Sequence, residues 1–347
     1  TDSLEYCYHI ARAIIENNSV RLSDNEINAL LKEKNPRAGN YIQKNFRGIF
    51  FKDSVLALLD NLRANVDALT GIKKSIALFA LGKTCVSGGG FGHFSSTTKG
   101  GQRHYTVKGF LEHYRDNLQR INSLVFDNGK DNKAHQGDIV DVAPRVKADL
   151  AYFDPPYATQ FSSTNYEKYY HFVEGLMTYW KGKEIDRSKK VRNYRIDTEG
   201  VTPSNAKQFF TDFLTASKHI PQWLISYRDN SYPKESEIKQ LAADAGKSAR
   251  MKSKDHKYQL AGKNRQGEPS NAKERLFICV PPGKRSATAD VDDAWRLYAE
   301  ALESLAVWED TENEIRYRVR DPRHFIPDTF KRKALEGIEG VSIIIAR

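Results

Sequence analysis

Residues 150–157 read Leu-Ala-Tyr-Phe-Asp-Pro-Pro-Tyr and join a short apolar run to an abrupt stop. The run over 150–153 has the length and composition of a buried strand. Because neither proline can donate a backbone hydrogen bond, the strand must end where the prolines begin. The next residues then form a rigid loop at the carboxyl end of a strand, where open α/β sheets bind their ligands.

This loop offers a carboxylate at Asp154, a fixed carbonyl at Pro155 and an aromatic ring at Tyr157. An exocyclic amine on a nucleobase is a poor nucleophile, because its lone pair is delocalised into the ring. Two acceptors that hold both N–H groups favour a pyramidal nitrogen, and the aromatic ring can stack on an extruded base. Fixed polar groups and alignment with a methyl donor then supply most of the catalysis. The alternative is a proline-rich turn after a core strand.

The tetrapeptide Asp154-Pro155-Pro156-Tyr157 resembles the catalytic motif of amino-group DNA methyltransferases. Its surroundings narrow the resemblance to the Dam-like class of DNA adenine methyltransferases, and it covers roughly residues 1–282. The supporting stretches follow the family's order: Arg47 to Phe51, Gly89 to Phe94, Gly137-Asp138-Ile139, Gln160-Phe161 and Asn165-Tyr166 through Tyr170-His171. The resemblance implies site-specific methyl transfer from S-adenosylmethionine to N6 of a flipped adenine in double-stranded DNA.

The same resemblance implies roles for individual residues. Asp154 and the Pro155 carbonyl hold the amine, Pro156 completes the motif, and Tyr157 stacks on the base. The implied contacts with the methyl donor come from Asp2, Asp138, Ile139, Phe153 and Asp154. No metal is implied.

The start of the chain departs from the family pattern. Such enzymes open with a lysine- and glycine-containing segment and a Phe-x-Gly-x-Gly turn for the donor, whereas this sequence opens at Thr1-Asp2. We therefore expect a fragment without the first strand and cofactor turn, which alone would be inactive. The alternatives are that another chain supplies these parts, or that the protein is a degenerate relative.

The charge balance favours a polyanionic partner. The net charge is +10 and the isoelectric point about 9.2, which promotes salt-sensitive association with nucleic acid. The cysteines Cys7, Cys85 and Cys279 are too far apart and odd in number for a disulfide framework or a zinc pattern. No apolar run approaches the roughly 20 residues that span a bilayer. We expect no membrane association and a cytoplasmic, nucleoid-associated protein.

Three segments are candidates for DNA contact. The Gly- and Ser-rich stretch 87–104 is a flexible loop by default, but the family comparison favours a DNA-facing loop. The basic run 181–195 follows the predicted base pocket and favours phosphate binding over a solvated loop. A basic hairpin spans 263–267. The predicted DNA-binding residues are Lys99, Arg103, His104, Lys189, Lys190, Arg192, Arg195, Lys263 and Arg265.

The predicted fold is α/β: a Rossmann-like S-adenosylmethionine-dependent methyltransferase sheet with a helical DNA-recognition insert and a small C-terminal α+β extension. The units expected are a core remnant at 1–34, the insert at 35–130, the catalytic core at 131–282, and a linker with extension at 283–347. Hydrophobic periodicity predicts the helices 3–17, 24–33, 53–70, 72–86, 106–122, 169–179, 203–219, 234–245 and 291–308. The predicted strands are 135–140, 150–153, 222–227, 258–260, 276–280, 316–320 and 341–346.

Two other functions stay open at this point. The loop suits methylation of a cytosine or guanine amine, or of an RNA base, and the chain also fits a non-catalytic DNA-binding relative. A cognate restriction endonuclease acting on the same site is a further expected partner, in a restriction-modification system or in the protection of phage or mobile-element DNA. The target sequence is not readable, because specificity depends on the placement of side chains in the insert.

Overall fold

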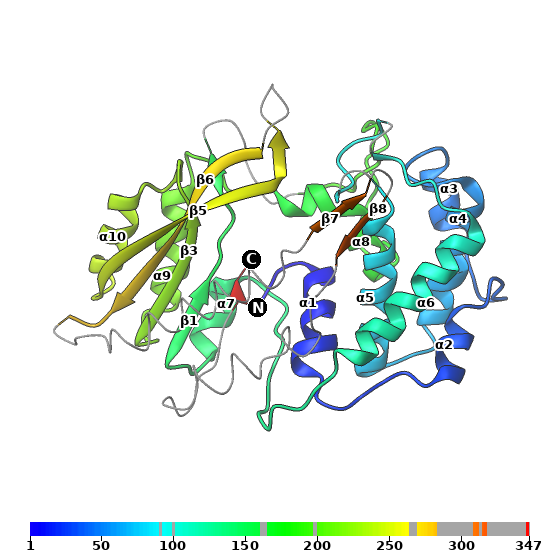
Figure 1. Cartoon of the computed structure of the whole chain (residues 1–347), viewed down its shortest axis with the longest axis horizontal. Helices are drawn as coiled ribbons and strands as arrows, with labels where there is room; N and C mark the ends of the chain where they lie inside the picture. The colour runs from blue at the N-terminus through cyan, green and yellow to red at the C-terminus, as the bar shows by residue number, and fades with distance from the viewer. Residues whose placement is uncertain are drawn as a thin grey trace.

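The computed structural model describes residues 1–89, 92–98, 101–159, 165–196, 200–263, 269–282, 308–311, 314–317 and 345–346. Figure 1 shows a twisted sheet with helices α9 and α10 at one side of the molecule and a group of helices at the other. The two parts have separate clusters of buried side chains. The observed architecture is therefore a mixed α/β fold, as the sequence predicts at that level.

The sheet is mixed, with the strand order β5-β6-β3-β1-β9. Strand β1 (Leu150–Phe153) is parallel to β3 (Gln222–Arg228), with Phe153 opposite Ile225. Strand β6 (Pro269–Val280) is antiparallel to β3, and β5 (Ser248–Lys263) is antiparallel to β6. On its other side β1 pairs in parallel with β9 (Ile345–Ala346). Strand β1 is thus paired on both sides, which fixes the loop that follows it.

One face of the sheet is covered by short helices. They are α7 (Ile139–Val142), a 3-10 turn (Ala143–Arg145), α9 (Ala206–Ala216) and α10 (Glu235–Asp244). Burial alternates along β1, so Ala151 and Phe153 face this layer while Leu150 and Tyr152 are less buried. Aromatic side chains of Phe210, Phe213 and Trp223 fill the layer around Phe153. This core holds the end of β1 rigidly in place.

The helical part consists of α1 (Glu5–Ala11), which continues as a π-helix (Arg12–Glu16), α2 (Asp24–Leu30), α3 (Tyr41–Phe46), α4 (Asp53–Val66), α5 (Gly71–Ser87), α6 (Val107–Ser123) and α8 (Tyr166–Thr178). They share one large buried cluster that runs from Ala13 to Tyr194. Helix α5 packs against α6, α1 and α8. The predicted core remnant at 1–34 and the predicted insert therefore share a hydrophobic core with α8; the predicted domain boundaries stay a prediction.

Two buried charged side chains join α8 to its neighbours. The first residues of α1 lack a side-chain cap of their own, and the Glu174 carboxylate accepts the backbone N–H of Glu5 (3.0 Å) and of Tyr6 (2.9 Å) instead. At the other end of α8, Arg63 donates from Nε to the Leu176 carbonyl (2.8 Å) and from Nη2 to the Met177 carbonyl (3.0 Å). Both pairings satisfy helix-end groups that water cannot reach.

Most predicted helices are confirmed to within a few residues, because their apolar faces were regular. The capping box expected at the second helix is present: Ser23 accepts the Glu26 backbone N–H, and Glu26 accepts the Ser23 N–H. Thr106 caps α6 in a similar way. The first predicted helix is shorter than 3–17 in α-helical form, since its second half winds as a π-helix. None of the helices formed by the described residues has the length and apolar composition of a membrane span.

The strand predicted over 135–140 is wrong in its second half. Only Gln136 forms a bridge, in parallel with Asp2. Asp138 instead caps α7, with Oδ1 accepting the Val140 backbone N–H at 2.9 Å. Aspartate at this position stabilises a helix start, and this local preference overrides the apolar Ile139-Val140 pair that suggested a strand.

The predicted strands 150–153, 222–227, 258–260 and 276–280 are all present, the last two inside the long β5–β6 pair. In the C-terminal region, residues 291–307 of the predicted helix lie outside the described residues, and Trp308 belongs to β7 (Trp308–Thr311). Strand β7 pairs with β8 (Glu314–Tyr317), which overlaps the strand predicted at 316–320. Strand β9 falls within the strand predicted at 341–346.

The buried Glu174 predicts a pH-dependent stability. Burial raises its pKa to about 7 against the usual 4.5, although the backbone N–H groups of Tyr6 and Glu5 oppose the shift. A raised pKa in the folded state adds stability below the unfolded-state pKa, and this contribution is lost as the pH rises through the folded-state value. Between pH 4.5 and 7 we expect wild type to lose roughly 3 kcal/mol of unfolding free energy relative to Glu174→Gln.

This difference is measured by denaturant unfolding of both proteins at several pH values. Above pH 8 the two profiles are expected to run in parallel. Parallel profiles throughout would instead mean that Glu174 keeps an ordinary pKa in the folded protein.

Candidate active site and DNA interface

The tetrapeptide Asp154-Pro155-Pro156-Tyr157 lies at the carboxyl edge of the sheet, directly after β1. Pro155 is buried, whereas Asp154, Pro156 and Tyr157 are partly exposed. The next two residues form β2 (Ala158–Thr159), which pairs with β4 (Ser231–Tyr232) in the loop after β3. The tetrapeptide is therefore held between two strand pairings, with Asp154 partly exposed.

Tyr157 occupies a defined position in this loop. Its hydroxyl donates to Asp154 Oδ1 at 3.1 Å and lies 3.5 Å from Glu274 Oε1. Its ring meets the Tyr227 ring edge to face, with centroids 5.4 Å apart. The Tyr227 hydroxyl in turn donates to the Tyr232 carbonyl and accepts the Ala158 backbone N–H at 3.4 Å. These contacts fix the ring that the sequence predicts to stack on a base.

Glu274 is a site residue that sequence reasoning missed. It lies on β6 opposite Arg228 of β3, and Ser226 Oγ donates to its Oε1 at 2.5 Å. A single acid before an apolar strand is ordinary in any sequence, so no local signal marks it. Only the pairing of β6 with β3 brings this carboxylate to the tetrapeptide, more than a hundred residues away in the chain.

The two acids predicted to hold the methyl donor lie on neighbouring segments. Asp2 and Gln136 form a parallel bridge, and the Gly137 N–H donates to the Asp2 carbonyl at 3.0 Å. Asp2 Oδ1 accepts the Leu4 N–H at 2.8 Å, and Asp138 caps α7 as described. In these bonds each carboxylate uses Oδ1, and an ionised carboxylate oxygen can accept more than one hydrogen bond. Two acceptors on adjacent segment ends suit the hydroxyls and the amine of a nucleoside, so the residues fit S-adenosylmethionine.

Ile139 and Phe153 pack in the hydrophobic core next to these acids. Both belong to the cluster of buried side chains under β1, which places the start of α7 and the end of β1 in one region. The Phe153 ring packs against Phe213 at 5.1 Å and Trp223 at 6.2 Å between centroids and is fully buried. Any contact of Phe153 with the donor therefore involves its backbone and not its ring.

Arg103 corrects a prediction, because its guanidinium is not available to DNA. The residue is 1% exposed, and it donates to the carbonyls of Cys85 (2.6 Å), Gly101 (2.7 Å) and His93 (3.1 Å). The guanidinium also lies over the Phe94 ring at 3.7 Å, and burial lowers its pKa to about 10. Arg103 therefore organises the 92–104 loop from within, and the phosphate contact predicted for it is wrong.

The same loop is fastened to α8. The Phe94 N–H donates to the Tyr169 carbonyl at 2.7 Å, and buried His171 lies with Nε2 3.1 Å from the Phe94 carbonyl. Burial lowers the pKa of His171 to about 4, so the ring is neutral near pH 7 and donates from Nε2. His104, next to Arg103, is exposed, and Lys99 lies outside the described residues.

A second basic segment, the 184–195 hairpin, also leads back to α8. Ile185 bridges Tyr194, and the Tyr194 hydroxyl donates to Glu167 of α8 at 2.7 Å. The predicted DNA-contact residues Lys189 and Lys190 are exposed at the hairpin tip, where Arg192 is partly exposed. Arg195 is also exposed and pairs with Glu184 at 3.7 Å. Of the third basic segment, Lys263 ends β5 and Arg265 lies outside the described residues.

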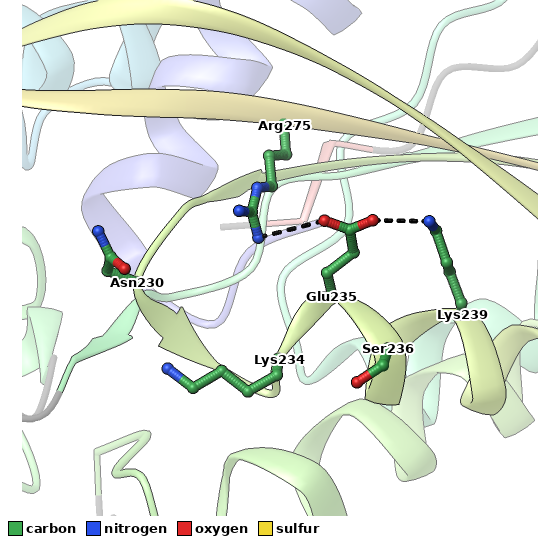
Figure 2. A pocket seen from close by; sticks show the side chains of 6 residues that line it. All are labelled: Asn230, Lys234, Glu235, Ser236, Lys239 and Arg275. Atoms are coloured by element: carbon green, nitrogen blue, oxygen red, sulfur yellow. Dashed lines mark hydrogen bonds and ion pairs between the residues drawn. The ribbon is translucent and has the colours of Figure 1, made fainter.

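Two cavities flank these segments. One of about 670 Å³ lies between the start of α3 and the 184–195 hairpin, and its lining includes Lys44, Arg187 and Arg195. The other, of about 410 Å³, lies beyond β4, and Figure 2 shows the residues that line it: Asn230, Lys234, Glu235, Ser236, Lys239 and Arg275. Glu235 pairs there with Lys239 at 2.6 Å and with Arg275 at 3.6 Å. The first cavity is lined by three basic and two acidic side chains, and the second by three basic side chains and one acidic side chain. The tetrapeptide lines neither.

The buried position of Arg103 predicts a large stability effect. Arg103→Met leaves three carbonyls without their donor in a place that water cannot easily reach, so we expect the unfolding free energy to fall by roughly 3 kcal/mol or more. The exposed neighbour gives the control: His104→Gln is expected to stay within about 0.5 kcal/mol of wild type. Denaturant unfolding measures both. Equal stability of Arg103→Met and wild type would contradict a structural role.

Comparison with known proteins identifies DNA methyltransferases as relatives of this chain. Type II methyltransferase M2.HphI from Haemophilus parahaemolyticus is 26% identical over 293 residues, which cover 80% of this chain and 82% of that protein. Modification methylase StsI from Streptococcus sanguinis is 33% identical over 87 residues, which cover 24% of this chain and 12% of that protein. No solved structure matches. The D12 class N6 adenine-specific DNA methyltransferases match residues 1–257, and the chain belongs to this family.

Proposed function

We propose that Asp154, Pro155, Pro156 and Tyr157 carry out the transfer of a methyl group from S-adenosylmethionine to N6 of adenine at specific sites in double-stranded DNA. The observation that carries the proposal is a partly exposed carboxylate beside a fixed tyrosine at the carboxyl edge of β1. Membership of the adenine-specific family supplies the base and the donor. The arrangement of this chain's own residues supports the role of each group.

The proposed chemistry needs two acceptors for one amine. The Asp154 carboxylate accepts one N–H of adenine N6 and the Pro155 carbonyl accepts the other, which localises the nitrogen lone pair. Burial of Pro155 and the pairing of β2 with β4 keep both acceptors in place, so no reorganisation is needed during the reaction. After methyl transfer the excess proton on N6 passes to Asp154 or to water.

The base must leave the duplex to reach these acceptors. Extrusion costs a few kcal/mol of unstacking, and the Tyr157 ring compensates by stacking on the base. S-adenosylmethionine supplies the electrophilic methyl group. Asp2 would accept from its ribose hydroxyls and Asp138 from its adenine amine, while Ile139 and the backbone of Phe153 would lie beside it.

The proposed DNA interface consists of the loop 92–104, the 184–195 hairpin and the turn after β5. Its phosphate-contacting residues are Lys99, His104, Lys189, Lys190, Arg192, Arg195, Lys263 and Arg265. The loop and the hairpin are both anchored on α8, which follows the tetrapeptide in the chain. A net charge of +10 supports a polyanionic partner.

The finer organisation is part of the same proposal. The helices of 35–130 form a DNA-recognition insert in a Rossmann-like methyltransferase fold, and 283–347 form a C-terminal extension. The two relatives are named as a type II methyltransferase and a modification methylase. This supports a role in restriction-modification, with a cognate restriction endonuclease as a partner that recognises the same site.

Asp154→Ala tests the catalytic assignment. Loss of the acceptor is expected to lower the rate of methyl transfer into duplex DNA at least about a hundredfold, while the DNA dissociation constant stays within about twofold of wild type. The matched control is Asp212→Ala, an exposed carboxylate on α9, with activity unchanged. Nucleoside mass spectrometry of the product is expected to show N6-methyladenine. Full activity of Asp154→Ala would refute the assignment, and a methylated cytosine or RNA base would refute the substrate.

The 184–195 hairpin predicts a salt effect on DNA binding. Each phosphate contact contributes about 0.9 to the slope of log K against log salt concentration. The double variant Lys189→Gln/Lys190→Gln is therefore expected to reduce the slope by about 1.8, with unchanged stability. Lys207→Gln, an exposed lysine on α9, is the control with no change of slope. A wild-type slope in the hairpin variant would exclude contact of these lysines with DNA.

A further inference from the structure

The Tyr157 hydroxyl lies between two carboxylates. It is 3.1 Å from Asp154 Oδ1 and 3.5 Å from Glu274 Oε1. A tyrosine hydroxyl has one proton to donate, so it engages one of these acceptors fully at any time. At the shorter distance this proton is directed to Asp154.

That hydrogen bond competes with the proposed reaction. The amine of the target base needs the Asp154 carboxylate as an acceptor, and a carboxylate that already accepts a hydrogen bond is a weaker acceptor for the next donor. A shift of the Tyr157 proton away from Asp154 would therefore strengthen this carboxylate as an acceptor when the base enters. Glu274 is the second acceptor within reach of the hydroxyl, and a small rotation of the hydroxyl proton suffices.

The Glu274 carboxylate is held in a position to accept a hydrogen bond from the Tyr157 hydroxyl. Its Oε1 already accepts from Ser226 Oγ at 2.5 Å, which orients the carboxylate toward the carboxyl edge of the sheet. The backbone around it is held by the β3–β6 pairing, in which Glu274 is opposite Arg228 and Leu276 is opposite Ser226. The carboxylate is thus held by two paired strands, β3 and β6, outside the tetrapeptide.

We propose that Glu274 is a positioning residue. As the target base binds, Glu274 accepts the hydrogen bond of the Tyr157 hydroxyl in place of Asp154, and Asp154 then accepts a hydrogen bond from the base amine. The proposal rests on the catalytic roles assigned above to Asp154 and Tyr157. It predicts that Glu274 affects the rate of the reaction through Tyr157 and has little influence on the affinity for DNA.

A purely structural role is the rival explanation. Glu274 joins β6 to β3 through Ser226, and its neighbour Arg275 joins β6 to α10 through Glu235. Figure 2 shows this second tether, with Glu235 between Arg275 and Lys239. Because adjacent residues of a strand face opposite sides of a sheet, the Arg275 tether lies on the other side of β6 from the Glu274 side chain. It therefore provides a control on the same strand.

A double-mutant cycle separates the two explanations. The enzymes compared are wild type, Glu274→Gln, Tyr157→Phe and the double variant, with kcat and KM measured for methyl transfer into duplex DNA. Glu274→Gln is expected to lower kcat about tenfold, the effect of one charge-assisted hydrogen bond, with KM for DNA within about twofold. In the Tyr157→Phe background, which has no hydroxyl, the same substitution is expected to change kcat less than about twofold.

Two further variants complete the test. Ser226→Ala removes the bond that orients Glu274 and is expected to lower kcat by a smaller factor that also disappears in the Tyr157→Phe background. Glu235→Gln breaks the tether on the opposite face and is expected to leave kcat unchanged. An equal loss from Glu274→Gln with and without the Tyr157 hydroxyl would overturn the proposal, as would an equal loss from Glu235→Gln. Failure of the full-length wild-type protein, with any natural upstream sequence restored, to methylate duplex DNA would instead disprove the proposed function itself.

Discussion

Helix α8 joins the segments proposed to carry out the chemistry and to contact DNA, and its position depends on buried charged groups at its ends and along its length. Glu174 satisfies the first N–H groups of α1, and Arg63 satisfies the last carbonyls of α8. Unpaired groups at these buried helix ends would each cost about 1–3 kcal/mol. The same helix anchors the 92–104 loop through His171 and the 184–195 hairpin through Glu167. A shift of α8 would therefore move both basic segments together.

In the sheet, the corresponding constraint is the end of β1. The parallel pairing with β3 places the tetrapeptide at the carboxyl edge, and the prolines prevent β1 from continuing. The β2–β4 pair then holds the far side of the loop. The antiparallel strand β6 adds Glu274 at the same edge, so the loop carboxylate has a second carboxylate near it without any proximity in sequence.

A structural feature of this protein can be predicted from the sequence when the residues that determine it are close together in the chain. The end of β1, the capping box at Ser23 and the helices with regular apolar faces were predicted because each follows from a few adjacent residues. The strand predicted over 135–140 was wrong in its second half, because the Asp138 side chain caps a helix there. Arg103 was misjudged because a basic residue in a glycine-rich loop resembles a phosphate ligand. Its burial depends on carbonyls of Cys85, His93 and Gly101, which only the folded chain brings together.

Glu274 and Arg103 together indicate where prediction from the family pattern ends. A motif predicts which groups touch the reacting atoms, since the chemistry requires particular residue types in a short stretch. It does not predict the residues that set the hydrogen-bonding state of those groups, since such residues come from any strand that pairs nearby. Tyr157 is an example. The tetrapeptide alone predicts an aromatic ring at the site, whereas the second acceptor for the hydroxyl depends on the register of β6 against β3. A one-residue slip of that register would turn Glu274 to the opposite face of the sheet, and the tetrapeptide would keep its sequence but lose its second acceptor.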